Sequence, residues 1–322
     1  MTSHPVAFVS GPEYLEHYAG LGHPESPERL AAIWERLADD GLWDRLEHVE
    51  PRPAELAELE LVHRPDYVEL VRRETAAGRA MLSTGDANIC PKSNEVALLA
   101  AGGCLAAVEA VCGGRARSAF CAVRPPGHHA TPSAGMGFCL FNNAAVAARH
   151  AQRACGVERV LIVDWDVHHG NGTQAAFYAD PSVLYFSTHQ RGHYPESLTG
   201  LGHPGQTGDG PAAGTTVNRP LPRHAGDASM LEAFREGLLP AAADFAPELV
   251  IVSAGFDCML GDPLGGLDLT ESGLAELTRM VMAVADESAC GRIVSILEGG
   301  YNLQTLPAAV AVHIRTLMEE RS

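Results

Sequence analysis

Lysine is almost missing from this chain: of its 23 basic residues, only Lys92 is a lysine. Because 40 residues are acidic, the formal net charge is −17 at pH 7. A protein that binds nucleic acid concentrates Lys and Arg to neutralise phosphates, so this composition argues against one. The acidity suits a cationic substrate, or simply a soluble surface. The preference for arginine is typical of a GC-rich bacterial genome, with thermal adaptation as the weaker alternative.

Signals for secretion and membrane insertion are also missing. Residues 1–10 show no basic stretch followed by a long apolar run, as a signal peptide would. No run elsewhere approaches the roughly 20 apolar residues that a membrane helix needs. The eight cysteines include no Cys-x-x-Cys pair and mostly have apolar neighbours, which predicts buried free thiols. We therefore expect a cytoplasmic protein.

Short apolar runs alternate with helical patterns along the whole chain. The runs are rich in β-branched residues and apolar throughout, as strands buried on both faces are; they cover 118–123, 160–163, 183–187, 249–253 and 293–297. The helical patterns cover 28–37, 95–111, 141–154, 228–245, 271–285 and 305–318. Without repeats or linkers, this alternation predicts one domain over residues 1–322, an α/β fold with a mostly parallel central sheet flanked by helices.

One long segment, from Gln190 to Val217, lacks any hydrophobic periodicity. It is rich in Gly, Pro and polar residues. Long loops inside compact domains are usually functional or mobile. The segment is therefore expected to be either an active-site loop or a flexible surface excursion.

Polar residues able to do chemistry follow each of the five apolar runs directly. In open α/β sheets, ligand-binding and catalytic groups collect at the carboxyl ends of the strands. Five runs that obey this rule predict one site at that edge, built from the segments Arg124–His129, Asp164–Gly172, Thr188–His189, Gly255–Asp257 and Glu298–Tyr301.

Within this set, Asp166 and His168 have the spacing of metal ligands. Side chains two apart in an extended segment point to the same side. Asp257, at the end of another run, is able to supply a third ligand. Two carboxylates and one imidazole leave coordination positions open for water and substrate, as a catalytic metal requires. Taken alone, the Asp-x-His pair is also consistent with a capping or hydrogen-bonded pair.

The tandem pair His128 and His129 lies in a turn bounded by Pro and Gly. Neutral imidazole is the usual general base near pH 7 and imidazolium the usual general acid. Each ring needs a partner on its other nitrogen, and Asp164 and Asn171 are the available candidates.

These motifs together resemble the zinc-dependent histone deacetylase superfamily. The segments RPPGHH, DWDVHHGNGT, SAGFD and EGGYN, with HPESPERL nearer the start, are similar to its signatures from about His23 to Tyr301. That superfamily includes bacterial deacetylase-like amidohydrolases, acetylpolyamine amidohydrolases and acetoin-utilisation proteins. Trp165, Asn171 and Glu298 make the chain most similar to the class II branch.

The resemblance implies the arginase/deacetylase fold and a mechanism. One Zn²⁺ per chain is expected on Asp166, His168 and Asp257. Catalysis is expected from His128 and His129, with Asp164 behind the first and Asn171 behind the second, and from Tyr301, which hydrogen-bonds the substrate carbonyl oxygen. The family also binds K⁺: an inner site falls on Asp164, Asp166, His168, Ser187 and Thr188, and an outer site on Phe177 and Val183.

The resemblance also implies a substrate channel. Gly137 and Phe138 match one wall, with the backbone carbonyl that receives the scissile amide N–H. Tyr194 falls on the opposite wall, where the family usually has phenylalanine. Polyamine specialists carry a glutamate at the position of Leu264, so polyamine selectivity is not expected here. Asp86 is expected either to bind the substrate backbone at the rim or to form a turn.

The expected activity is therefore hydrolysis of an acetyl or related acyl amide of lysine or a similar amine, with no nucleic-acid or membrane partner. An acetylpolyamine or other small-molecule amide stays open as the alternative substrate. An arginase-type enzyme would need a second metal and more carboxylates than the single one after Gly-Phe. A non-catalytic acyl-lysine binding module would commonly lack a ligand or the tyrosine, and this chain keeps all of them. The oligomeric state stays open.

Overall fold

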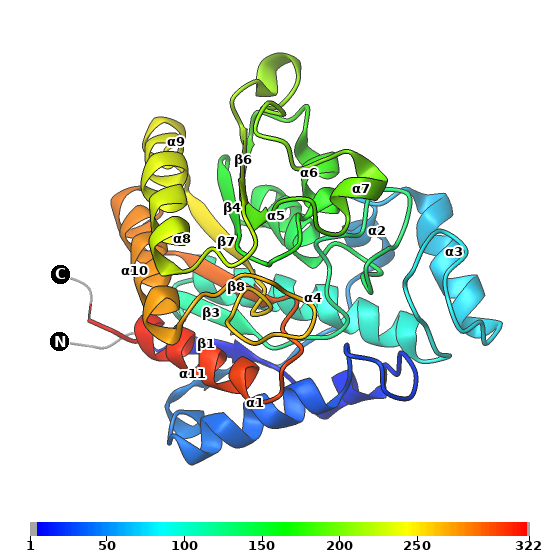
Figure 1. Ribbon diagram of the computed structural model, residues 1–322. Coiled ribbons are helices and arrows are strands. Elements are labelled where there is room, and N and C mark those ends of the chain that lie inside the picture. Colours follow the sequence, from blue (N-terminus) through cyan, green and yellow to red (C-terminus); the bar gives the residue numbers. More distant parts are fainter. Residues whose placement is uncertain (1–4, 321–322) are drawn as a thin grey trace.

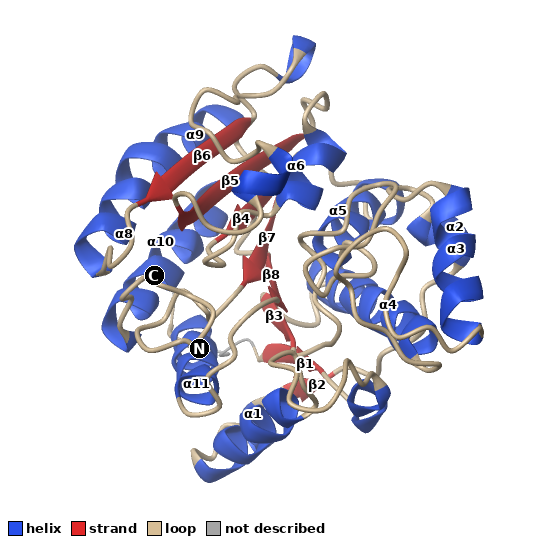
Figure 2. Ribbon diagram, turned by 45° about the vertical axis from the view of Figure 1, so that its right-hand side comes forward, coloured by secondary structure: helices blue, strands red, loops and turns tan. Residues whose placement is uncertain are grey.

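A single eight-stranded sheet organises the described part of the chain, residues 5–320 of the computed structural model. Neighbouring strands are parallel throughout, in the order β2-β1-β3-β8-β7-β4-β5-β6 (Figure 2). The strands are β1 (Val6–Val9), β2 (Glu47–His48), β3 (Ser118–Cys121), β4 (Val160–Asp164), β5 (Val183–Gln190), β6 (Thr216–Leu221), β7 (Leu249–Ala254) and β8 (Ile293–Leu297). The predicted single α/β domain with a parallel sheet is confirmed. Residues 1–4, part of the stretch expected to carry no signal peptide, and 321–322 lie outside the described residues.

All five predicted strands are present, and their side chains are buried on both faces. The structure adds β1, β2 and β6. Strand β6 occupies the end of the segment expected to be a loop, and it pairs with β5 from Tyr185–Thr216 to Gln190–Leu221. The apolar pattern of the sequence did not indicate this strand, because β6 is an edge strand that mixes buried and partly buried residues and tolerates a proline such as Pro220.

Helices cover both faces of the sheet (Figures 1 and 2). On one side, α1 packs on α11 and α10 packs on α11 and α8; on the other, α4 packs on α5. The helices are α1 (Glu28–Asp39), α2 (Leu56–Leu59), α3 (Pro65–Ala76), α4 (Ser93–Cys112), α5 (Asn143–Ala154), α6 (Asn171–Phe177), α7 (Glu196–Thr199), α8 (Asp227–Ala233), α9 (Leu239–Phe245), α10 (Glu271–Ser288) and α11 (Thr305–Leu317). The helix predicted over 228–245 is two helices joined by a wider turn over Phe234–Leu238.

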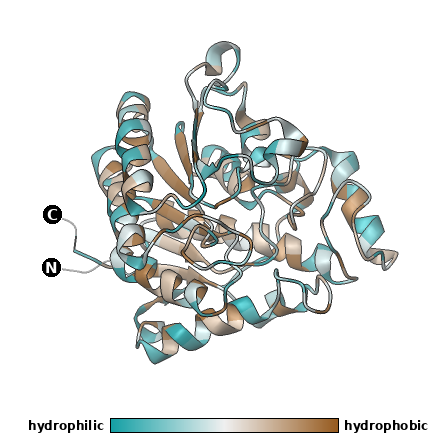
Figure 3. Ribbon diagram, viewed as in Figure 1, coloured by the Kyte–Doolittle hydropathy of each residue, from teal (hydrophilic) through white to brown (hydrophobic). Residues whose placement is uncertain are grey.

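Helix α4 is the one described helix that is long and apolar enough to cross a membrane by length and composition. The expectation that no run approaches the length and composition of a membrane helix is therefore wrong for this segment. Most of α4 is buried inside the protein, and Figure 3 shows it within the molecule. Its apolar character therefore matches that of a core helix, which passes the same test.

Two consecutive glycines let α4 approach its neighbours closely. A Cβ atom on Gly102 would lie 1.9 Å from the Arg52 carbonyl oxygen and 2.5 Å from the Ala54 nitrogen. The same segment donates a hydrogen bond from the Ala54 N–H to the Leu98 carbonyl, at 2.8 Å. The segment thus lies against the helix backbone, with no space for a side chain at residue 102.

We expect Gly102→Ala to lower the free energy of unfolding by about 1–3 kcal/mol, because the overpacking outweighs the helix propensity that alanine adds. Urea unfolding measures the change. Gly205→Ala is the matched control, since no atom lies within 4 Å of its added Cβ, and it should shift stability by less than about 0.5 kcal/mol. Equal stabilities of the two variants would contradict the close approach.

Candidate active site

The strand order brings the chemically able segments to one edge of the sheet. The sheet order places β8 and β7 between β3 and β4. The residues that follow these four strands therefore meet at the carboxyl edge, although up to about half the chain separates them in sequence. This is the position at which open parallel sheets bind their ligands.

Three buried side chains form a group able to hold a metal ion: Asp166, His168 and Asp257. One potential ligand atom from each lies within 4.8 Å of the others. The His168 Nδ1 atom lies 2.9 Å from Asp166 Oδ1 and 3.2 Å from Asp257 Oδ2. Asp166 leaves the end of β4, His168 follows it, and Asp257 follows β7.

Backbone groups hold both carboxylates in place. The Gly299 N–H donates to Asp166 Oδ2 at 2.9 Å, and the Val167 N–H donates to Asp257 Oδ1 at 2.9 Å. A Cβ atom on Gly299 would lie 1.9 Å from Asp257 Oδ2. Glycine at this position is therefore what allows the carboxylates to sit so close to the backbone of the neighbouring strand end.

The donor set fits a cation. Among the described residues, Asp257 Oδ2 accepts no hydrogen bond although it is fully buried. Burial, together with the charge of Asp166, raises the pKa of Asp257 to about 7. Burial acts to lower the pKa of His168, but the two nearby carboxylates of Asp166 and Asp257 raise that pKa to about 10. Concentrated negative charge with an unsatisfied oxygen is stabilised when a metal ion occupies the site.

The tandem histidines lie beside this group, each with a partner on Nδ1. His128 Nδ1 lies 3.1 Å from Asp164 Oδ2, which also accepts a bond from the Tyr185 hydroxyl at 3.0 Å. His129 Nδ1 lies 2.8 Å from Asn171 Oδ1. A neutral amide behind one ring and a carboxylate behind the other give the two imidazoles different electrostatic surroundings.

The pKa values of the two histidines are shifted in opposite directions. Burial and the nearby charges of His128 and His168 hold the pKa of His129 well below its usual range. Burial also acts to lower the pKa of His128, but the carboxylates of Asp166, Asp164 and Glu298 raise it well above the usual range. The surroundings therefore favour the neutral form of His129 and the protonated form of His128, the forms that a general base and a general acid take.

Glu298 was expected as the first residue of the Glu298–Tyr301 segment and as a marker of the class II branch, and the structure bonds its carboxylate to the turn that carries the tandem histidines. Its Oε2 atom accepts the backbone N–H groups of Gly127 at 2.7 Å and His128 at 3.1 Å. Its Oε1 atom accepts the Ser253 hydroxyl at 3.1 Å. Burial raises the pKa of Glu298 to about 7. The side chain anchors the turn that carries the tandem pair.

A buried ion-pair network holds the loop that carries Tyr301, which we call the tyrosine loop. Arg29 donates to the carbonyl oxygens of Glu298 and Gly300, both at 2.6 Å, and its guanidinium carbon lies 4.9 Å from the Tyr301 ring centroid. Glu25 pairs with Arg29 at 3.2 Å and with Arg124. The HPESPERL motif supplied the signal for Glu25 and Arg29, but nothing in the sequence indicated which residues they contact.

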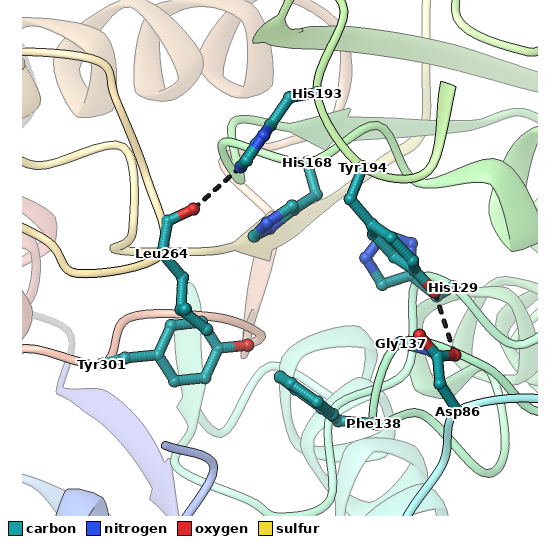
Figure 4. Close-up of a pocket in the computed structure, with 9 residues that line it drawn as sticks. All are labelled: Asp86, His129, Gly137, Phe138, His168, His193, Tyr194, Leu264 and Tyr301. Carbon is teal, nitrogen blue, oxygen red and sulfur yellow. Dashed lines mark hydrogen bonds between the residues drawn. The ribbon is translucent and has the colours of Figure 1, made fainter. Parts of the chain in front are cut away.

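A narrow cavity of about 220 Å³ leads from the surface to His168 of the metal group (Figure 4). Both predicted walls line it, and Phe138 faces Tyr301 at 6.0 Å between ring centroids. All five residues expected at the channel belong to its lining; in full, the lining is Asp86, His129, Gly137, Phe138, His168, His193, Tyr194, Leu264 and Tyr301. His193 is an addition that the sequence analysis missed.

The residues expected to bind K⁺ are buried around β4 and β5. Asp164 and Ser187 are neighbours in the register of these strands, and the Ser187 hydroxyl lies 2.9 Å from His189 Nδ1. The Thr188 hydroxyl makes no hydrogen bond among the described residues. Phe177 and Val183 are buried farther along the same region. Potassium binding stays a prediction.

The chain belongs to the histone deacetylase family, whose domain model matches residues 23–317. Members of this family are metal-dependent, and the protein is a deacetylase-type hydrolase of linear amides. It is 40% identical to a "Probable deacetylase" of Archaeoglobus fulgidus, covering 91% of this chain and 80% of the relative. It is also 40% identical to a "Histone deacetylase-like amidohydrolase" of Pseudomonas aeruginosa, covering 96% and 80%.

The chain is also similar to part of a larger relative and to a solved structure. The chain is 43% identical to human "Polyamine deacetylase HDAC10" over 91% of its own length, but it spans only 44% of that protein. The crystal structure of the HDA15 HD domain superposes with a TM-score of 0.91 at 39% identity, covering 98% of this chain and 89% of that one. Sequence and fold thus give the same family.

We expect Asp257→Asn to lower the metal affinity by more than about 100-fold, because losing a group that merely orients a ligand already costs about 10–100-fold. Elemental analysis of the purified protein after dialysis measures the retained metal. Asp44→Asn, a change outside the site, is the control for purification losses. A full complement of metal in Asp257→Asn would show that this carboxylate is not a ligand.

Proposed function

We propose that the protein is a zinc-dependent deacetylase, a single catalytic domain over residues 1–322, that hydrolyses an acetyl or related acyl amide of a lysine side chain or similar amine. One observation carries the proposal. The narrow channel is lined by His168, one of the three residues of the metal group, and by His129 and Tyr301 (Figure 4). A linear acylated side chain fits such a channel, with its carbonyl group next to the metal ligands.

Asp166, His168 and Asp257 would hold the Zn²⁺. When bound there, the ion polarises the amide carbonyl and makes a water molecule more acidic. His129, held neutral by burial, accepts a proton from that water. The water oxygen forms a bond to the carbonyl carbon, the C–N bond breaks, and an imidazolium of the tandem pair protonates the leaving nitrogen.

Tyr301 contributes a hydrogen bond to the oxygen on which negative charge develops. Burial and the charge of Asp257 raise the pKa of Tyr301 well above its usual range, so the hydroxyl keeps its proton. Arg29 and Glu25 fix the loop that carries this ring. The Gly137 carbonyl is the proposed acceptor for the N–H of the scissile amide, and Phe138 and Tyr194 enclose the linear chain.

The proposal also includes two K⁺ sites and the location of the protein. K⁺ bound near Asp164 would reduce repulsion among the buried carboxylates behind His128, with Ser187 and Thr188 as neighbours on β5. A second K⁺ near Phe177 and Val183 would stabilise the end of α6. The proposed location is the cytoplasm, and neither nucleic acid nor a membrane is a proposed partner.

Acetyl-lysine is the favoured substrate, and an acetylated polyamine is the second candidate. The human relative named a polyamine deacetylase supports the second. At the mouth of this channel, however, Leu264 presents an apolar side chain, which offers no charge to a second ammonium group. Asp86 is the acidic residue that lines the cavity at its rim.

The activity is tested with the purified protein and an acetyl-lysine peptide, with released acetate as the readout. Hydrolysis should stop after treatment with a chelator and return when Zn²⁺ is added. Turnover that persists in the fully demetallated protein would refute a metal-dependent reaction.

Tyr301→Phe should lower kcat by about 10²–10³-fold, because it removes one donor aimed at the developing oxyanion. The ring, its contact with Arg29 and the metal ligands are all retained, so metal content and Tm should match the wild type. Steady-state kinetics on the acetyl-lysine peptide gives the ratio. Near-normal kcat would place the tyrosine outside the reaction.

Leu264→Glu should shift selectivity from acetyl-lysine towards N8-acetylspermidine. A carboxylate at the mouth attracts the distal ammonium by about 1 kcal/mol, roughly a fivefold change in kcat/KM. Leu264→Gln, of similar size and uncharged, is the matched control. If the wild type already prefers the polyamine, another acidic group such as Asp86 makes the selection.

A further inference from the structure

Three of the loops that line the channel mouth are connected by the side chains of His193 and Tyr194. The loop over 83–88 carries Asp86, the loop after β5 carries His193 and Tyr194, and the loop after β7 carries Leu264. Both connecting side chains belong to the middle loop: His193 bonds to one neighbour and Tyr194 to the other (Figure 4).

Tyr194 ties the middle loop to the opposite wall through Asp86. The Tyr194 hydroxyl donates to Asp86 Oδ1 at 3.1 Å, and the same oxygen accepts the Gly137 backbone N–H at 2.7 Å. Gly137 directly precedes Phe138, the aromatic residue of that opposite wall. One carboxylate oxygen therefore connects the two walls between which a substrate chain must pass, and hydrogen bonds to a charged acceptor are the stronger ones.

His193 closes the other side of the mouth. Its Nε2–H donates to the Leu264 carbonyl at 2.8 Å, and its ring stacks on His168 with 4.9 Å between centroids. The loop that carries Asp86 is also bonded to the Phe138 wall, because Thr84 and Gly135 exchange two hydrogen bonds of 3.1 Å. These hydrogen bonds connect the three loops to one another.

We propose that Tyr194, through its hydroxyl bond to Asp86, is a specificity-determining residue that holds the channel mouth narrow and selects unbranched aliphatic amides over wider ones. This inference rests on the proposed function. A phenylalanine at this position would keep the aromatic wall but leave the two walls untied. The Tyr194 hydroxyl is therefore the group that connects the two walls, and a phenylalanine would lack it. Asp86 Oδ2 carries no bond from Tyr194 or Gly137 and is available to the substrate backbone.

The test compares two peptides that differ only in the acylated side chain. One contains acetyl-lysine, and the other contains 4-(acetamidomethyl)phenylalanine, whose amide is also that of a primary alkylamine but whose linker is a ring. The ratio of their kcat/KM values is measured for the wild type and for three variants: Tyr194→Phe, Asp86→Asn and Asp86→Ala. Tm and metal content are recorded for each variant.

We expect the wild type to favour acetyl-lysine strongly and Tyr194→Phe to reduce that preference by about tenfold, chiefly by raising kcat/KM for the aromatic linker. Asp86→Asn should keep most of the wild-type ratio, because its amide oxygen accepts the same two bonds. Asp86→Ala should behave like Tyr194→Phe. A mere loss of stability would lower both rates together and leave the ratio unchanged.

A wild-type ratio in folded Tyr194→Phe that still holds its metal would overturn the proposal, and so would an Asp86→Asn ratio equal to that of Asp86→Ala. Failure of the proposed function gives a different result: the wild type itself would hydrolyse neither peptide.

Discussion

Repulsion among buried carboxylates is the constraint on which the rest of this structure depends. Asp164, Asp166, Asp257 and Glu298 are all fully buried within a few residues of the strand ends. Burying a charge without a partner is costly. Each carboxylate is therefore held by backbone N–H groups, by an imidazole or by a hydroxyl, and a bound cation would neutralise the remaining charge.

The same constraint explains the different roles of the two tandem histidines. His128 faces Asp164 and lies 3.8 Å from Asp166, so negative charge favours its protonated form. His129 faces the neutral amide of Asn171 and lies close to two other imidazoles, so its neutral form is favoured. One arrangement of carboxylates thus supplies the metal site, the acid and the base.

Two sets of contacts hold the loops of the site in place: a buried ion-pair network and the hydrogen bonds at the channel rim. The Glu25, Arg29 and Arg124 network fixes the tyrosine loop through backbone carbonyls. At the rim, His193 and Tyr194 connect three loops whose own sequences contain little regular structure. A channel that admits a linear side chain requires both the buried network and the rim hydrogen bonds, because loops rather than the sheet set its width.

The sequence by itself determined the fold class, the five central strands, and the residues of the metal group and the histidine pair. The site residues were predictable because each follows a strand directly and the carboxyl ends of parallel strands share one edge, and because local spacing carries geometry, as in the two-residue step from Asp166 to His168. Only the tertiary structure decided the edge strand β6, the position of Glu298 beneath the histidines, and the contacts of Arg29 and Tyr194. These contacts join segments that lie from about 100 to about 270 residues apart, and no local pattern encodes which distant loop a side chain will meet once the strands have ordered themselves in the sheet.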